Sequence, residues 1–121
     1  MTLICFILIV HFVADFIVQT DEQARGKSGS LYPLIAHITS YSIALWFALI
    51  CYSYFDRSVT GLALYVFWNG LAHFVTDLVS SRVGKARWEA GDRRGFFIVV
   101  GADQLVHSLC LILSIPLFLV K

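Results

Sequence analysis

All four histidines of this chain lie in strongly apolar stretches, and three of them stand four positions from an aspartate. Residues four positions apart lie on one face of a helix, so each pair presents an imidazole and a carboxylate together. These two groups together suit zinc, iron or manganese, and the pattern therefore predicts a metal site. The pairs are His11 with Asp15, His73 with Asp77, and Asp103 with His107, while His37 stands alone in a fourth stretch.

The order within the pairs indicates that they meet at one depth. The histidine comes first in two stretches, and the aspartate comes first in the stretch that runs the opposite way. At 1.5 Å per residue, each carboxylate lies about 8–12 Å from the nearer polar loops, and its histidine lies about 6 Å deeper. An ionised carboxylate in a lone spanning helix costs about 2.5–3.5 kcal/mol on insertion scales. We therefore expect these groups to face a bundle interior and to share a divalent cation.

The expected cation is zinc, with manganese or iron as alternatives, and the site holds one ion or two ions that share bridging carboxylates. Asp15 or Asp77 is the candidate general base, and His37 binds metal or shuttles protons. Three nearby amides orient ligands, bind substrate or make structural hydrogen bonds, and these are Gln19, Gln104 and Asn69. The candidate metal ligands are His11, Asp15, His37, His73, Asp77, Asp103 and His107. A metal-free proton or ion relay and a purely structural hydrogen-bonded cluster are the alternatives.

Composition indicates that these residues lie in a membrane protein. Hydrophobic residues make up 59% of the 121 residues and charged residues 14%, against about 45–50% and about 25% in soluble domains. The net charge of +1 gives no indication of a nucleic-acid partner. Four apolar segments, 2–19, 33–54, 59–81 and 95–120, each approach the roughly 20 residues that span a bilayer. We expect a single domain over residues 1–121, an all-α integral membrane four-helix bundle.

The basic residues predict an orientation. Residues 20–32 and 82–94 contain all of the nine Lys and Arg except Arg57 and Lys121. The positive-inside rule places those two loops in the cytoplasm and both termini outside, as in a bacterial inner membrane. The first apolar stretch has no preceding basic region and no small-residue cleavage site, so we expect it to remain in the mature protein.

A faint internal repeat accompanies the pairs. His-Phe-Val-Ala-Asp begins at His11, and His-Phe-Val-Thr-Asp begins at His73. Two helical hairpins related by a parallel repeat would produce this pattern, and convergence over five residues is the alternative. Between the first two segments, Thr20 and Gln23 fit a capping box of a short helix. The cysteines lie in apolar segments and are expected to be buried thiols; they are Cys5, Cys51 and Cys110.

The motifs H-F-V-A-D-F-I-V-Q-T, His37 alone, H-F-V-T-D and D-Q-L-V-H occur in an order that resembles a family of small bacterial and phage membrane proteins. This family is known as domain of unknown function 3307, and the resemblance covers essentially the whole chain. It implies a membrane location but no particular chemistry. More loosely, the pattern is similar to inner-membrane, metal-dependent hydrolases that carry His and Asp within transmembrane helices. That similarity implies that the three His/Asp pairs are ligands.

The favoured function is metal-dependent hydrolysis of a lipid or lipid-linked substrate that reaches the site from the cytoplasmic leaflet. The metal would lower the pKa of a bound water and polarise the scissile group. One alternative is a transporter or channel for an ion, proton or small solute, which at this chain length would need to form a homo-oligomer. The other is a non-enzymatic membrane modulator with a structural metal site.

Overall fold

Every regular element in the described part of the chain is helical. The computed structural model describes residues 1–52 and 58–119. The elements in order are α1 (Leu3–Phe12), the π-helical turn η1 (Val13–Ile17), α2 (Asp21–Gly26), α3 (Leu31–Tyr52), α4 (Val59–Glu89) and α5 (Arg93–Phe118). The prediction of an all-α fold is confirmed.

Three helices, α3, α4 and α5, are long and apolar enough to cross a membrane. The first apolar segment is helical only over Leu3–Ile17, which is shorter than the predicted 2–19. It ends early because Thr20 adopts an extended conformation and begins α2 as its N-cap. α3 begins at Leu31 instead of residue 33, and α5 begins at Arg93 instead of residue 95. The predicted ends at residues 54 and 120 lie outside the described residues.

The prediction of a polar loop over residues 82–94 is wrong for most of its length. α4 continues past residue 81 to Glu89, because Arg, Lys and Ala in this stretch are strong helix formers. The connection to α5 is confined to residues 90–92. Gly91 has a φ of 76°, a left-handed conformation that favours glycine and ends a helix. The Asp92 side chain then accepts a hydrogen bond from the Gly95 N–H and caps α5.

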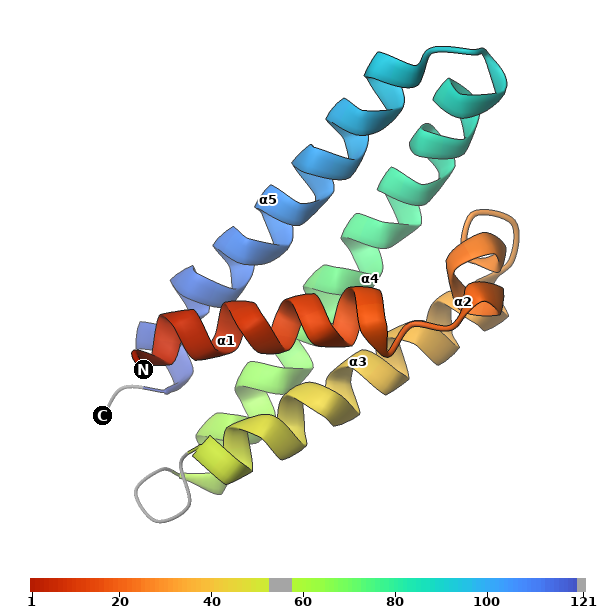
Figure 1. The fold of residues 1–121 in the computed structure, drawn as a ribbon. Coiled ribbons are helices and arrows are strands. Elements are labelled where there is room, and N and C mark those ends of the chain that lie inside the picture. The colour runs from red at the N-terminus through yellow and green to blue at the C-terminus, as the bar shows by residue number, and fades with distance from the viewer. Residues whose placement is uncertain (53–57, 120–121) are drawn as a thin grey trace.

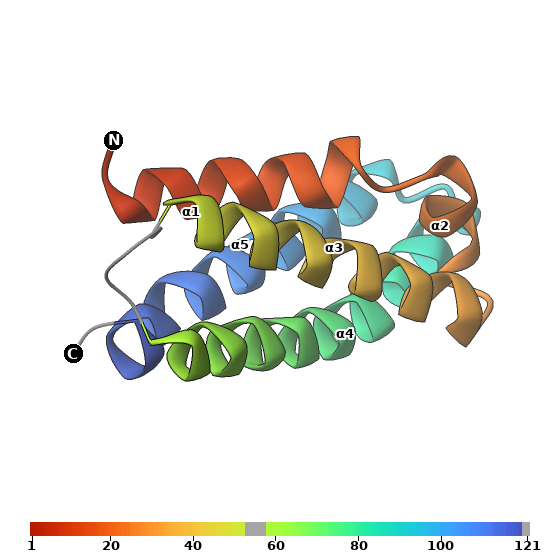
Figure 2. The same ribbon diagram turned by 90° about the horizontal axis from the view of Figure 1, so that it is seen from below.

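Four helical segments surround one core, with α1 and α4 on opposite sides. α1 packs against α3 and α5, and α4 packs against the same two helices, as Figure 2 shows. The N-terminus and the start of α4 lie at one end, whereas α2 and the turn between α4 and α5 lie at the other (Figure 1). α1 and α4 therefore run parallel, which is the arrangement expected for two hairpins related by a parallel repeat.

The apolar core fills the part of the molecule nearer the termini. Its buried members include Ile7, Leu45, Leu49, Tyr65 and Leu111. The polar pairs adjoin this core near the middle of α4 and α5 and at the junction of α1 with η1.

The outward faces of the helices are also apolar. Phe47, Phe67 and Leu117 are between 62% and 72% exposed. The prediction of buried cysteines is wrong: Cys5 and Cys51 are exposed and Cys110 is partly exposed, and all three are free thiols. Among the described residues, large apolar side chains are more often exposed than buried, so an apolar residue type does not by itself mark the core of this molecule.

The predicted capping box is confirmed. The Thr20 hydroxyl accepts a hydrogen bond from the Gln23 N–H, and the Gln23 side chain accepts one from the Thr20 N–H. α2 then packs against the start of α3. A side chain at Gly26 would place its Cβ 2.6 Å from Pro33 Cγ, so only glycine permits this close turn. The turn directs the following residue, Lys27, back into the molecule.

Candidate metal centre

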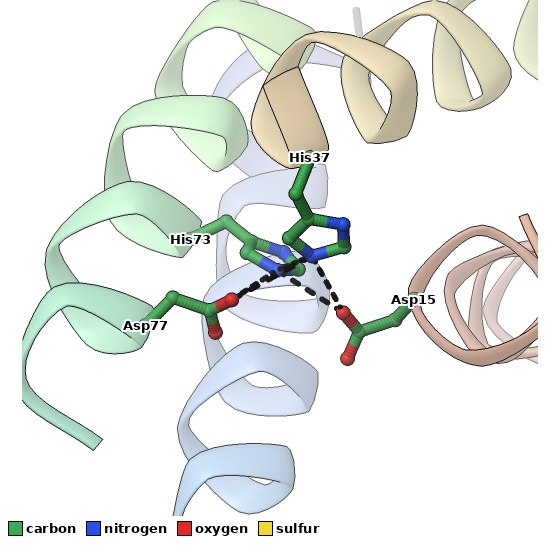
Figure 3. A group of neighbouring side chains, drawn as sticks. All are labelled: Asp15, His37, His73 and Asp77. Atoms are coloured by element: carbon green, nitrogen blue, oxygen red, sulfur yellow. Dashed lines mark hydrogen bonds and ion pairs between the residues drawn. The ribbon is translucent and has the colours of Figure 1, made fainter. Parts of the chain in front are cut away.

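Four side chains from three elements converge on one point (Figure 3). Each is at most 5% exposed, and each offers one donor atom within 4.8 Å of the others. They are Asp15 in η1, His37 on α3, and His73 and Asp77 on α4. The four-donor set is defined here as His37 Nε2, His73 Nε2, Asp15 Oδ1 and Asp77 Oδ2.

Five of the six separations within the four-donor set are close to the edges of a tetrahedral coordination shell. His37 Nε2 lies 3.1 Å from His73 Nε2 and 3.0 Å from Asp15 Oδ1. His73 Nε2 lies 3.3 Å from Asp15 Oδ1, and Asp77 Oδ2 lies 3.6 Å from both nitrogens. Zinc bonds to nitrogen and oxygen of about 2.0–2.2 Å give tetrahedral edges of about 3.3–3.6 Å. The set therefore has the size and the composition of a site with two imidazoles and two carboxylates.

Hydrogen bonds alone satisfy this cluster poorly. A neutral imidazole carries one N–H, yet the facing nitrogens of His37 and His73 approach the same oxygen of Asp15. Buried polar atoms without a partner are uncommon and require an explanation. Six such side-chain atoms occur among the described residues, and five of them belong to predicted ligands: His11 Nδ1, His73 Nδ1, Asp77 Oδ1, His107 Nδ1 and His107 Nε2. None of these five atoms belongs to the four-donor set, so the unmet polar capacity lies beside that set.

The other predicted ligands lie beside the four-donor set. The His107 ring stacks on the His73 ring, with centroids 3.9 Å apart. His107 Nε2 lies 3.6 Å from Asp77 Oδ1, and His107 Nδ1 lies 3.4 Å from Asp103 Oδ2. Two further groups have donor atoms within 4.8 Å of one another, and these are His11, Asp15 and His107, and Asp77, Asp103 and His107. The structure thus brings all seven predicted ligands together.

Two of the three predicted amides contact these ligands. Gln104 donates to Asp15 Oδ2 at 2.8 Å and to Asp103 Oδ2 at 3.0 Å, and its oxygen accepts from His11 Nε2 at 3.1 Å. The Gln19 amide nitrogen lies 3.2 Å from both ring nitrogens of His37.

Asn69 has a different place. Its amide donates to the Tyr65 carbonyl and, across to α5, to the Ser114 hydroxyl, both at 2.9 Å. These hydrogen bonds link α4 to α5 in the apolar core, one turn away from His73. Asn69 therefore makes structural hydrogen bonds, which is one of the roles that the sequence predicted for the three amides.

The π-helical turn η1 places Asp15. The Val18 N–H bonds to the Val13 carbonyl, five residues earlier, at 2.9 Å. Such turns insert one residue into a helix and occur frequently at functional sites. Ala14 and Asp15 face inward here, while Phe16, Ile17 and Val18 face outward. Helical spacing predicts the pairing of His11 with Asp15 but gives no signal for this turn.

Lys27 is a member of the cluster that the sequence did not indicate. Its ammonium group donates to Asp77 Oδ2 at 2.8 Å, and its side chain is 19% exposed. The Ser81 hydroxyl donates to the Lys27 carbonyl and ties this loop to α4. The sequence showed only a lysine in a polar loop, and the capping box followed by Gly26 was the available signal that the chain turns back there.

A pocket of about 650 Å³ adjoins the cluster on the side of α2 and of the α4–α5 turn. Asp15, Asp103 and Gln104 lie at its wall next to the cluster. The Ser80 hydroxyl, which also lines the pocket, donates to Asp103 Oδ1. The remaining lining combines basic and aromatic residues, including Arg25, Lys27, Lys85, Trp88, Phe96 and Phe97. The pocket therefore suits an amphipathic ligand with a negatively charged group.

These features define a class: an all-helical protein with a buried His/Asp cluster beside an amphipathic pocket. Residues 3–120 match the model of the family described as "Protein of unknown function (DUF3307)", and the chain belongs to that family. The resemblance carried by the four sequence motifs is therefore confirmed. No curated protein and no solved structure shows significant similarity to the chain.

Proposed function

We propose that this chain is a four-span protein of the bacterial inner membrane, where it acts as a metal-dependent hydrolase on a lipid or lipid-linked substrate. The four-donor set would bind the cation, with zinc as the first candidate. One observation carries the proposal: four buried donors at tetrahedral separations lie next to a pocket with apolar walls and basic residues.

Helix length and surface composition support the membrane location. α3, α4 and α5 meet the length and hydropathy of spanning helices, and the outward faces are apolar. The segment Leu3–Ile17 extends about 22 Å, against about 30 Å for the hydrocarbon core. It would cross with local thinning of the bilayer, which short spans tolerate at modest cost.

Charge supports the orientation. Arg25, Lys27, Lys85 and Arg93 lie toward the end that carries α2 and the α4–α5 turn. The positive-inside rule places this end in the cytoplasm and both termini outside. The pocket would then open to the inner leaflet, where an anionic lipid headgroup meets the basic residues and the acyl chains meet the aromatic ones.

In the proposed reaction, the oxygen of water bonds to the phosphorus or acyl carbon of an ester, and the bond from that atom to the leaving oxygen breaks. A cation held by all four donors would need a fifth coordination position for water, which zinc sites can adopt, and it would then supply Lewis acidity and a reactive water. Asp15, His37 and Asp77 all belong to the four-donor set. In this reaction they serve as metal ligands, and another residue acts as the general base. Asp103, held by Ser80 and Gln104 on the pocket wall, accepts the proton of water and returns it to the leaving oxygen.

Metal content tests the proposal directly. The protein is purified in detergent, and zinc per chain is measured by elemental analysis for the wild type, Asp77→Asn and Asp21→Asn. Asp77 is buried in the donor set, whereas the Asp21 side chain is 94% exposed. We expect zinc in the wild type and in Asp21→Asn, and loss of the donor-set zinc in Asp77→Asn. Hydrolysis is then measured on vesicles that contain phospholipids and lipid-linked phosphates.

Each other outcome contradicts a stated part of the proposal. A folded wild type without metal would overturn the metal site. Bound metal with no hydrolysis of any lipid would favour a non-enzymatic modulator. Metal-dependent ion uptake in liposomes that is lost in Asp77→Asn would favour a transporter.

A further inference from the structure

Asp15 and Asp77 each contribute one oxygen to the four-donor set and turn the other oxygen elsewhere. Asp77 Oδ1 lies 3.6 Å from His107 Nε2 and has no hydrogen-bond partner among the described residues. Asp15 Oδ2 accepts only a neutral amide hydrogen bond, from Gln104. Both carboxylates thus retain a second oxygen that can bind a cation.

Two imidazoles, His11 and His107, lie beside this second side, and each has at least one ring nitrogen without a hydrogen-bond partner among the described residues. The Gln104 oxygen can only accept a hydrogen bond, so His11 Nε2 carries the hydrogen, and neutral His11 has its lone pair on Nδ1. His11 Nδ1 and both nitrogens of His107 have no hydrogen-bond partner among the described residues. Both rings are 3% exposed. A buried ring nitrogen that has a lone pair and no hydrogen-bond partner can bind a metal ion.

The internal repeat relates this second group to the first. α1 and α4 are parallel and diagonal, and each carries the H-F-V-x-D motif. The four-donor set takes His73 from one motif and His37 from the second helix of the other hairpin. The counterpart under the repeat takes His11 from the other motif and His107 from α5. Asp15 belongs with His11 and His107 to one further group of close donor atoms, and Asp77 belongs with His107 and Asp103 to another.

We infer that the centre is dinuclear: a second divalent cation binds on the side of His107 and His11, and Asp15 and Asp77 bridge the two ions. This inference rests on the proposed function for the first cation. Asp103 Oδ2, 3.4 Å from His107 Nδ1, would orient that ring as carboxylates commonly orient metal-bound histidines. Gln104 would release Asp15 Oδ2 when the second ion binds.

A dinuclear centre narrows the substrate class. Paired cations about 3.5–4 Å apart stabilise both the attacking and the leaving oxygen in phosphoryl transfer. Two divalent ions with Lys27 carry more positive charge than the three carboxylates of the cluster neutralise. The excess favours an anionic substrate, and the basic residues of the adjoining pocket have the same preference. The expected substrate is therefore a phosphate ester or pyrophosphate of a lipid.

Zinc stoichiometry and manganese spectroscopy test the inference. The variants are His107→Gln and His37→Gln, a matched pair from opposite sides of the bridge. We expect two zinc ions per wild-type chain and one in each variant. With Mn²⁺ in place of zinc, electron paramagnetic resonance of the wild type should show a spin-coupled pair, and each variant should show an isolated ion.

The outcomes separate the two proposals. One zinc in the wild type that is lost in His37→Gln and kept in His107→Gln would overturn the second site and leave the first intact. A folded wild type without zinc would overturn both. If His107→Gln does not fold, as judged by size-exclusion chromatography, the wild-type manganese spectrum decides, and an uncoupled signal at full loading contradicts the inference.

Discussion

At the scale of single residues, Lys27 provides a positive charge that compensates the buried carboxylates when no cation is bound. Asp15 and Asp77 are buried among imidazoles, and removal of one partner from a buried ion pair leaves an uncompensated charge. The Lys27 ammonium lies on Asp77 Oδ2, which is itself a member of the four-donor set. The proposed cation would therefore replace, at that oxygen, a positive charge that the chain already provides.

Lys27→Met is expected to lower the stability of the metal-free protein by about 3 kcal/mol, at the low end for a broken buried ion pair because Lys27 is 19% exposed. Zinc should then raise the unfolding temperature of this variant more than that of the wild type, because no ammonium competes for Asp77. Thermal unfolding in detergent, with chelator and with zinc, measures both effects.

Lys85→Met is the matched control. Lys85 pairs with Glu89 at 3.8 Å on the outside of α4, and both side chains are more than half exposed. Such pairs contribute about 0–1 kcal/mol. Equal losses of stability in the two variants would contradict a special role for Lys27.

At the scale of elements, the sequence predicted which side chains share a helix face better than where each helix begins and ends. The i,i+4 pairs identified which side chains share a helix face, because the helical period fixes this locally, and the capping box located α2. The π-helical turn and the extension of α4 were not predicted. The π-helical turn depends on small preferences between alternative backbone hydrogen bonds, which neighbouring helices decide. The residues after 81 are strong helix formers, but their charge indicated a loop.

Gly70 sets the distance between α3 and α4 next to the centre. A Cβ at Gly70 would lie 2.8 Å from Ser42 Oγ. Gly70→Leu should separate these helices, lengthen the 3.1 Å approach of His37 to His73, and weaken zinc binding by about tenfold or more, a loss of about 1.4 kcal/mol. Competition with a chromogenic chelator measures this affinity.

Gly101→Leu provides the comparison on α5. A Cβ at Gly101 would have nothing within 4 Å, and the residue is exposed. Its zinc affinity should match that of the wild type. Unchanged affinity in Gly70→Leu would show that the contact between α3 and α4 does not position the donors.

At the scale of the whole molecule, the sequence predicted that the ligands meet but not how the helices are ordered. The reversed order of Asp103 and His107 indicated a shared depth, and depth follows from helix rise alone. The diagonal relation of α1 and α4 could not be predicted, because short connections are compatible with more than one order around a core. The place of Lys27 depends on that order, since its loop must lie beside α4.

The short first segment makes topology a sharp test of the membrane proposal. In a background in which Cys5, Cys51 and Cys110 are replaced by Ala, we compare Thr2→Cys with Ala90→Cys. A membrane-impermeant maleimide applied to intact spheroplasts should label the Thr2→Cys variant, and should label the Ala90→Cys variant only after the membrane is opened. Equal protection of both positions would mean that Leu3–Ile17 enters the bilayer and returns without crossing it.

The division of the centre between the two hairpins has a consequence for assembly. The α1–α3 hairpin brings His11, Asp15 and His37, and the α4–α5 hairpin brings His73, Asp77, Asp103 and His107. Neither hairpin alone holds a complete four-donor set. Two polypeptides cut between α3 and α4 would each lack half of this set, so the proposed cation would bind to all four donors only when both halves are in one membrane.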